Sequence, residues 1–261
     1  MRKPDGKRRQ DSLTRERVVD ASIAILDEGG EKGLTFQALA KRLKTGAGAI
    51  YWHVENKSDL LVAASDAIVI NVIAARSAGG SPADKIRALA LDLFDALDER
   101  PWLGSALAQA PGSMPTIRIL EHLGRQVRAM SVPHDDEWTV VAALLNYVLG
   151  VGGQNAANAE MARMQHLERD AFLGEIALRL SALDPEDFPF VQSIAPKVPD
   201  HDDRADFLTG IDLFLDGIAR RIGSLAASGS AAGKEQPEQV GDNGGEETSS
   251  PPSTESHVTL Q

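Results

Sequence analysis

Two short runs of the chain, residues 35–43 and 47–54, repeat apolar residues at the spacing of one helix face. The apolar positions are Phe36, Leu39, Ala40 and Leu43 in the first run, and Ala47, Ile50, Tyr51 and Val54 in the second. Such spacing is typical of an amphipathic α-helix. A short turn, Lys44-Thr45-Gly46, joins the two runs. The pattern predicts a helix-turn-helix unit, in which the second helix enters the DNA major groove and the first braces it.

Helical periodicity continues along the rest of the chain, and no alternating strand pattern of useful length interrupts it. We therefore expect an all-α fold. Thr14 or Ser12 can cap the first helix, and Asn56 can cap the fourth, with Asp59 completing a capping box. Residues 184–203 hold four prolines and six acidic residues, so we expect an extended surface loop there. The expected helices cover residues 14–28, 35–43, 47–54, 56–76, 83–98, 101–110, 116–130, 135–164 (with a possible bend at 150–153), 168–182 and 204–225.

Changes in composition divide the chain into four parts. Residues 1–13 form a basic flexible arm, which either lies along DNA or only aids solubility. Residues 14–76 carry the helix-turn-helix and a connecting helix, and a glycine- and serine-rich break follows. Residues 82–226 form a larger helical domain. Residues 227–261, rich in Gly, Ser, Pro and Glu, form a disordered acidic tail because they have almost nothing to bury.

The formal net charge of −11 at first argues against a DNA-binding protein. Residues 1–60, however, contain 12 Lys and Arg against 9 Asp and Glu, a net charge of +3, which leaves −11 − 3 = −14 for the remaining 201 residues. This asymmetry indicates a DNA-reading part joined to a part with another task. An ordinary acidic protein with a slightly basic end fits the charge alone equally well.

Several classes of protein and site are not expected from this sequence. It has no cysteine, which excludes disulfides, thiol catalysis and thiolate metal sites. It has no phosphate-binding glycine loop, nucleophile elbow or paired histidines at metal-ligand spacing, so we expect no enzyme, no metal site and no cofactor. The first fifteen residues are polar, and the most apolar run, residues 138–153, is shorter than a membrane span. We expect a soluble cytoplasmic protein.

The run LTFQALAKRLKTGAGAIYWHVENKSDLLVAASD resembles the DNA-binding domain of TetR-family repressors, especially the tetracycline-repressor branch. The resemblance is dense over residues 14–70 and looser beyond. It implies an N-terminal three-helix helix-turn-helix DNA-binding domain followed by a C-terminal helical ligand-binding and dimerisation domain. The positions expected to face DNA are Thr35, Gln37, Lys44, Thr45, Ala47, Gly48, Ala49, Tyr51, Trp52, His53 and Lys57.

The chemistry of these residues suggests a division of roles. Lys57 offers a fixed positive charge, and Tyr51 and His53 can donate hydrogen bonds, all suited to phosphate oxygens, which set register rather than sequence. Gln37 and Thr45 can read base edges.

The recognition helix departs from the tetracycline-repressor pattern at Ala47-Gly48-Ala49, so we expect a different operator, read partly through Lys44 and DNA shape. Ala47 and Ala49 can touch thymine methyl groups. Ile50 is expected in the core, and Trp52 is left open between a packing role and a DNA contact.

The resemblance also implies a homodimer whose C-terminal helices enclose a small-molecule effector, with release from a pseudo-palindromic DNA operator. The helix at 138–153 and the final helix, with Gly210 and Gly217 on one face, would pair with their copies. Histidines that chelate metal–tetracycline in that branch are missing, since Ile73 stands at one position, so a different effector is expected. The candidate effector contacts are Phe94, Trp102, Gln126, Met130, Asn146 and Tyr147; for the aromatics, plain core packing is the competing interpretation. The alternative for the whole chain is an all-α protein-interaction module with no specific DNA target.

Overall fold

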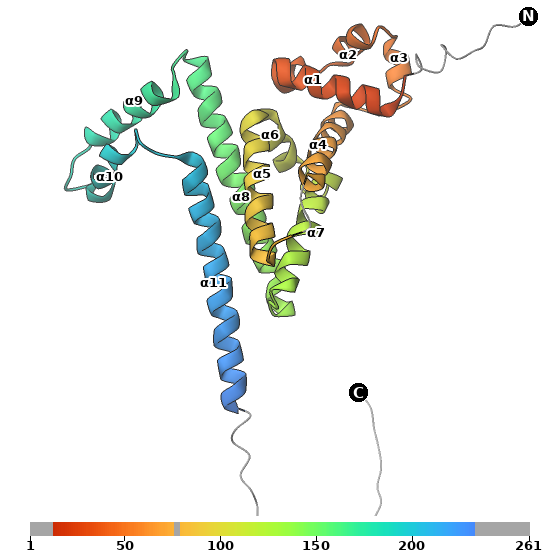
Figure 1. Cartoon of the computed structure of the whole chain (residues 1–261). Helices are drawn as coiled ribbons and strands as arrows, with labels where there is room; N and C mark the ends of the chain where they lie inside the picture. Colours follow the sequence, from red (N-terminus) through yellow and green to blue (C-terminus); the bar gives the residue numbers. More distant parts are fainter. Residues whose placement is uncertain (1–12, 76–78, 233–261) are drawn as a thin grey trace, which may run out of the picture. The chain divides into compact units, whose positions relative to one another are not determined.

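In a computed structural model, residues 13–75 and 79–232 are described, and their side chains as far as residue 224. The described part of the chain is helical and contains no strand, so the all-α prediction is confirmed. The helices are α1 (Arg15–Gly33), α2 (Phe36–Leu43), α3 (Ala47–Ile50), α4 (Lys57–Ala74), α5 (Pro82–Glu99), α6 (Pro101–Gln109), α7 (Met114–Ala129), α8 (His134–Met164), α9 (Arg169–Ser181), α10 (Pro189–Ile194), the 3₁₀ turn η2 (Ala195–Lys197) and α11 (Asp203–Ala232) (Figure 1).

Several helices begin at a residue whose side chain accepts a hydrogen bond from a free backbone N–H of the first turn, which is the usual N-cap arrangement. Thr14 accepts from the amide of Arg17 at 3.3 Å, and Asn56 accepts from the amide of Asp59 at 2.9 Å. Ser81 forms a full capping box with Asp84 at the start of α5. The expected caps at Thr14 and Asn56 are therefore confirmed.

The main differences from the sequence-based expectations concern helix ends. At Gly30 the backbone leaves helical geometry (φ 60°, ψ −165°), which glycine permits, but one further turn follows and α1 ends at Gly33. Residues 184–203 are not one extended loop, because α10 and η2 form inside them. Proline is tolerated in a first helical turn, and Pro189 occupies that place in α10. The final helix runs to Ala232, past the expected end at 225, through alanines that favour helix.

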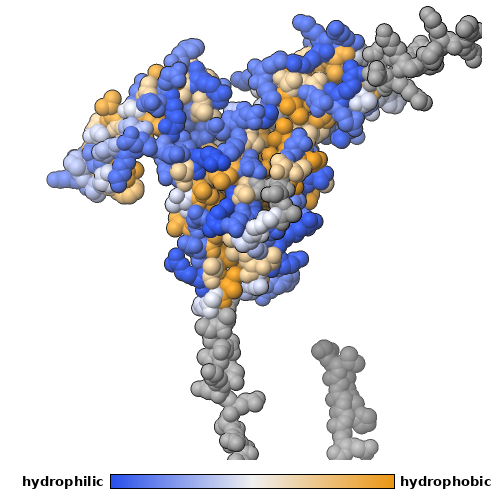
Figure 2. All heavy atoms as spheres, in the orientation of Figure 1, coloured by the Kyte–Doolittle hydropathy of each residue, from blue (hydrophilic) through white to orange (hydrophobic). Residues whose placement is uncertain are grey.

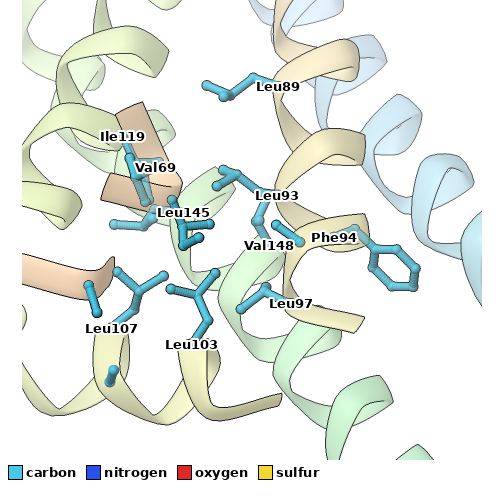
Figure 3. Packing of buried hydrophobic residues seen from close by; sticks show 14 of the residues in the cluster. Val69, Leu89, Leu93, Phe94, Leu97, Leu103, Leu107, Ile119, Leu145 and Val148 are labelled. Atoms are coloured by element: carbon cyan, nitrogen blue, oxygen red, sulfur yellow. The ribbon is translucent and has the colours of Figure 1, made fainter. Parts of the chain in front are cut away.

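The core lies where α4, α5, α6, α7 and α8 pack together. Fully buried leucines at positions 93, 97 and 103 meet Ile119 of α7 and Val148 of α8 there (Figure 3). The sequence suggested a bend of α8 near residues 150–153, but α8 is one continuous helix. Gly152 instead serves close packing, because a Cβ added there would lie 2.5 Å from Leu97 Cδ1.

Helix α11 is fastened to this core by aromatic contacts and ion pairs. Phe207 of α11 stacks on Phe94 of α5 with ring centroids 4.6 Å apart, and it also stacks on Tyr147 of α8 at 5.5 Å. Arg87 of α5 donates to Asp212 at 2.5 Å, and Arg221 pairs with Asp136 at the start of α8. Three elements far apart in the sequence are thereby held side by side (Figure 1).

Contacts divide the chain into two units, Met1–Gly223 and Ser224–Gln261. The helix-turn-helix and the larger helical region both belong to the first unit. Of the second unit, the structure describes only the end of α11. The basic arm (except residue 13) and the acidic tail beyond residue 232 lie outside the described residues.

Candidate DNA-binding surface and effector cavities

The helix-turn-helix is held by a small apolar centre beneath α2 and α3. Leu34, Leu39 and Ile50 are fully buried, and Val54 is 4 % exposed. The expected core role of Ile50 is therefore confirmed, and Val54 is buried as well. Burial of these side chains fixes α3 against α2, and this sets which residues can face a groove.

The turn between α2 and α3 depends on one residue in the left-handed region. Lys44 has φ 52° and ψ 46°, and its amide caps the end of α2. The amide of Thr45 donates to the carbonyl of Ala40 at 3.0 Å. Thr35 caps the other end of α2 by accepting from the amide of Ala38 at 3.0 Å. Thr35 and Lys44 thus shape the unit as well as lying on its surface.

None of the eleven residues expected to face DNA is buried. Thr45, Ala47, Ala49 and His53 are half-buried, and the exposed ones are Thr35, Gln37, Lys44, Gly48, Tyr51, Trp52 and Lys57. Helix α3 proper is only four residues long, and residues 51–53 form a turn rather than the continuous helix expected to Val54. The turn still bonds back to α3, since the amide of Val54 donates to the carbonyl of Ile50 at 3.2 Å.

Two aromatic side chains stand out on this surface. Tyr51 stacks on Phe36 with centroids 4.3 Å apart and an interplanar angle of 11°, yet it stays 55 % exposed. Trp52 is 88 % exposed, so within the described chain it packs against almost nothing. The open question about Trp52 is therefore decided against a packing role inside one subunit.

Lys57 has a role that the sequence did not indicate. Its Nζ donates to the backbone carbonyl of Glu31 at the end of α1. The carboxylate of Glu31 in turn accepts from the hydroxyl of Ser105 on α6. The expected phosphate contact is thus linked through α1 to the larger helical region.

A second polar contact joins the same two elements. Trp102 Nε1 on α6 donates to Asp27 Oδ1 on α1 at 2.8 Å, and Arg100 Nε lies 3.5 Å from the same oxygen. Trp102, proposed from sequence as an effector contact, is 6 % exposed and makes this α6–α1 contact. Sequence reasoning missed Asp27, because only the tertiary structure brings it to Trp102.

The net positive charge of residues 1–60 is not spread evenly along that region. Residues 1–12 contain five Lys and Arg against two Asp, a net charge of +3. Residues 13–60 contain seven of each sign, a net charge of zero. Residues 13–60 are therefore neutral overall, and the net positive charge of residues 1–60 comes from residues 1–12.

Residues of the larger helical region line cavities in the described part of the chain. The α9 cavity, about 710 Å³, opens between α5, α8, α9 and the start of α11, and Phe94 lines it. The α7 cavity, about 510 Å³, lies between α4, α5 and α7, and brings Gln126 together with Ile73 and His122. Both volumes are within the range of small-molecule sites.

The six candidate effector contacts do not converge on one site. Phe94 lines the α9 cavity and Gln126 the α7 cavity, while Met130 and Tyr147 are half-buried and Asn146 is exposed. Figure 3 shows Phe94 directed away from the leucine cluster, toward α11.

Tyr147 binds within the chain, since its hydroxyl donates to the carbonyl of Phe207 at 3.1 Å, and burial raises its pKa. Gly210 packs against this tyrosine rather than leaving room for a partner helix: a Cβ there would lie 1.8 Å from the Tyr147 hydroxyl oxygen.

No group of three or more acidic or histidine side chains suited to a metal ion occurs in the described part of the chain. Within the same residues, one helix, α8, is long and apolar enough to span a membrane by length and composition. It packs inside the chain against α5, α6 and α7.

Comparison with known proteins finds relatives of both the helix-turn-helix and the whole helical fold. Residues 18–64 match the family described as "Bacterial regulatory proteins, tetR family". The solved structure of the transcriptional regulator SCO7222, a TetR from Streptomyces coelicolor, shares 47 % sequence identity over 80 % of this chain and 99 % of its own, with a TM-score of 0.72.

Two curated relatives match shorter stretches. An HTH-type transcriptional regulator of Saccharopolyspora erythraea is 32 % identical over 139 residues, which cover 53 % of this chain and 59 % of that protein. Tetracycline repressor protein class D of Escherichia coli is 42 % identical over 62 residues, 24 % of this chain and 27 % of its own. The matches thus span less than two thirds of these two relatives, but nearly all of the structural neighbour. The chain belongs to the TetR family of bacterial regulatory proteins.

Proposed function

We propose that this protein is a ligand-responsive transcriptional regulator, acting as a repressor, that binds a pseudo-palindromic DNA operator as a homodimer. The observation that carries the proposal is the aromatic pair beside α3. Trp52 is 88 % exposed and Tyr51 55 % exposed, on a helix-turn-helix whose own core is already filled. Two neighbouring aromatic side chains left exposed beside the recognition helix support an interaction surface there. The indole N–H of Trp52 and the hydroxyl of Tyr51 are hydrogen-bond donors suited to phosphate oxygens.

We infer that the dimer forms through α8 and α11, and two exposed side chains support this. Leu213 on α11 is 68 % exposed and Trp138 on α8 is 69 % exposed. Hydrophobic residues reach the surface along α11 on the face drawn in Figure 2. A Cβ at Gly217 would meet nothing within 4 Å in the single chain, which leaves room for a neighbour. A twofold dimer presents two recognition units, and these match a palindromic site.

Release by an effector requires that the ligand bind the DNA-incompetent state more tightly than the DNA-bound state. The α6–α1 contact through Trp102 and Asp27 provides a route from the larger helical region (residues 82–226) to the DNA-binding region (residues 14–76). Arg118 of α7, which donates to Asp66 of α4 at 2.7 Å, provides another. A shift of α6 or α7 on ligand binding would move both DNA-binding regions of the dimer.

The proposal assigns the chain no catalytic step and a cytoplasmic location, where its DNA target lies. The effector is a small molecule other than the metal-chelated drug of the tetracycline branch, because Ile73 stands in the α7 cavity at a position where the resemblance would place a metal-chelating histidine.

The test is a mobility shift with the DNA upstream of the protein's own gene, repeated at rising salt. We expect saturable binding that weakens with salt, because phosphate contacts release counterions. The double substitution Tyr51→Ala, Lys57→Ala should weaken it by at least tenfold. The slope of log K against log salt concentration should become shallower by about 1.8. Each of the two Lys57 side chains of a dimer accounts for about 0.9 of this change.

A matched control is the double substitution Phe190→Ala, Lys197→Ala, which removes an exposed aromatic and an exposed lysine from α10 and η2. It should bind DNA as the wild type does. Tyr51→Phe keeps the stack on Phe36 and removes only the hydroxyl, so it separates a lost contact from a damaged fold. Equal DNA binding by wild type and the Tyr51, Lys57 variant would instead favour a protein-interaction module.

A further inference from the structure

The stacked rings of Phe36 and Tyr51 join the two helices of the helix-turn-helix. Phe36 is the first residue of α2, and Tyr51 directly follows α3 (Figure 1). Their ring centroids are 4.3 Å apart, and the rings are nearly parallel, with an interplanar angle of 11°. The other stacked rings of the described chain, at positions 94, 147 and 207, lie in the larger helical region.

Phe36 is fixed by its own helix and by the core. Thr35 caps α2 by accepting a hydrogen bond from the amide of Ala38 at 3.0 Å, which sets the backbone at Phe36. The Phe36 side chain is half-buried and packs against the apolar core of the chain. A ring that is held in this way provides a rigid platform on which a second ring can stack.

Tyr51 depends on such a platform because its backbone alone does not orient its side chain. The amide of Tyr51 donates to the carbonyl of Ala47 at 3.4 Å, and the preceding residue, Ile50, is fully buried. These contacts fix the backbone, but a tyrosine side chain still rotates about two bonds. Tyr51 is 55 % exposed, and its stack on Phe36 limits that rotation.

The stack leaves the Tyr51 hydroxyl available to a partner. Among the described residues, no hydrogen bond occupies this hydroxyl. The other tyrosine of the chain, Tyr147, instead uses its hydroxyl internally and donates to the carbonyl of Phe207 at 3.1 Å. A hydroxyl that is held in place before binding meets a phosphate oxygen at a smaller loss of side-chain freedom than a mobile one.

We propose that Phe36 is a positioning residue for DNA binding, which holds Tyr51 in the orientation in which its hydroxyl meets a phosphate. Phe36 acts through Tyr51 and makes no DNA contact of its own. This role rests on the proposed function. Holding one side chain in place is equivalent to a few-fold in affinity, and a dimer has two such pairs, so the expected effect is about tenfold.

The first test is a double-mutant cycle in DNA affinity, with the DNA upstream of the protein's own gene as the probe. Phe36→Leu keeps an apolar side chain but removes the ring, so it should weaken binding about tenfold. In a Tyr51→Ala background the same substitution should change affinity by less than about twofold, because no side chain is left to position. Phe36→Tyr keeps a ring and should bind within about twofold of the wild type.

A matched control is Phe190→Leu, which removes an exposed ring from α10, outside the helix-turn-helix. It should leave DNA affinity unchanged. If Phe36→Leu does not fold, Phe36→Met serves as a second variant without a ring, because methionine fills irregular gaps in a core. Circular dichroism checks that each variant keeps its helices.

The second test needs no DNA. The chain contains two tyrosines, so labelling with fluorotyrosine gives two fluorine NMR signals, and Tyr51→Phe identifies the one from Tyr51. Phe36→Leu should move the Tyr51 signal, because the ring current of the stacked phenyl group is lost. The signal of Tyr147, which stacks on Phe207 instead, should stay in place.

An equal loss of affinity from Phe36→Leu in the wild-type and Tyr51→Ala backgrounds would overturn the proposal, since Phe36 would then act through the fold or touch DNA directly. Unchanged affinity in Phe36→Leu, or an unmoved Tyr51 signal, would overturn it as well. A wild-type protein that binds no DNA would contradict the proposed function itself, and only in that case would both fail together.

Discussion

Replacing Gly210 by alanine tests how α11 is seated on α8. A Cβ at this position would lie 1.8 Å from the Tyr147 hydroxyl oxygen, 2.4 Å from Cζ and 3.0 Å from Cε2. These distances are too short for any real contact, and Tyr147 is held by its stacks on Phe207 and Phe214 and by its hydrogen bond to Phe207. The tyrosine must therefore move, or the two helices must separate.

The magnitude combines three contributions. Overpacking a filled site costs about 1–3 kcal/mol. Loss of the Tyr147 hydrogen bond costs about 1 kcal/mol. Alanine in place of glycine inside a helix stabilises the folded state by about 1 kcal/mol. The net loss is about 2 kcal/mol, which for a domain of this size lowers the melting temperature by about 4–8 °C.

The measurement is thermal unfolding followed by circular dichroism, at equal protein concentration because a dimer's stability depends on it. Gly174→Ala on α9 is the matched control, since a Cβ there meets nothing within 4 Å. It should raise the melting temperature slightly. In a Tyr147→Phe background, which lacks the nearest atom, the cost of Gly210→Ala should shrink. A Gly210→Ala protein as stable as the wild type would refute the reasoning.

Three further predictions follow from the same structure. Deletion of residues 1–11, which carry all five basic residues of the arm, should weaken DNA binding and lower the salt slope, measured by mobility shift, by up to about 4.5 per subunit. Asp27→Ala removes the acceptor of the Trp102 N–H, so it should cost about 1 kcal/mol of stability in urea unfolding; a smaller cost of Asp27→Ala in a Trp102→Phe background, which lacks the donor, would confirm the pair. Hydrogen bonds from Arg128 lower the pKa of Glu137 to about 2, so the stability from this pair is present above pH 4.5 and is lost as the pH falls toward 2; Glu137→Gln should lack this acid-dependent loss.

The helix positions were largely predictable because they depend on local signals. Thr14 and Asn56 each cap a helix as the sequence indicated, and apolar spacing placed Ile50 in the core. The segment with four prolines was less predictable, because α10 is a short helix with no strong periodicity of its own. A proline-rich composition does not exclude a helix when the proline occupies its first turn.

That the residues expected to face DNA are not buried was predictable for the group, since a short helix after a tight turn has few positions free of the core. Their individual surroundings were not. Only the structure shows that Tyr51 stacks on Phe36 and that Lys57 binds the carbonyl of Glu31, because these pairs are 15 and 26 residues apart in the sequence.

The sequence by itself determined the all-α fold, the helix caps and the recognition unit, because periodicity, capping and turn chemistry act over a few residues. Only the tertiary structure showed which contacts are made by the residues of the C-terminal helices that the sequence had suggested for effector binding or dimer formation. Trp102 faces Asp27, Gly210 accommodates Tyr147, and Phe94 turns to α11, each across 60 residues or more of chain. The physical reason is that such contacts depend on which helix faces meet, and no local pattern specifies that.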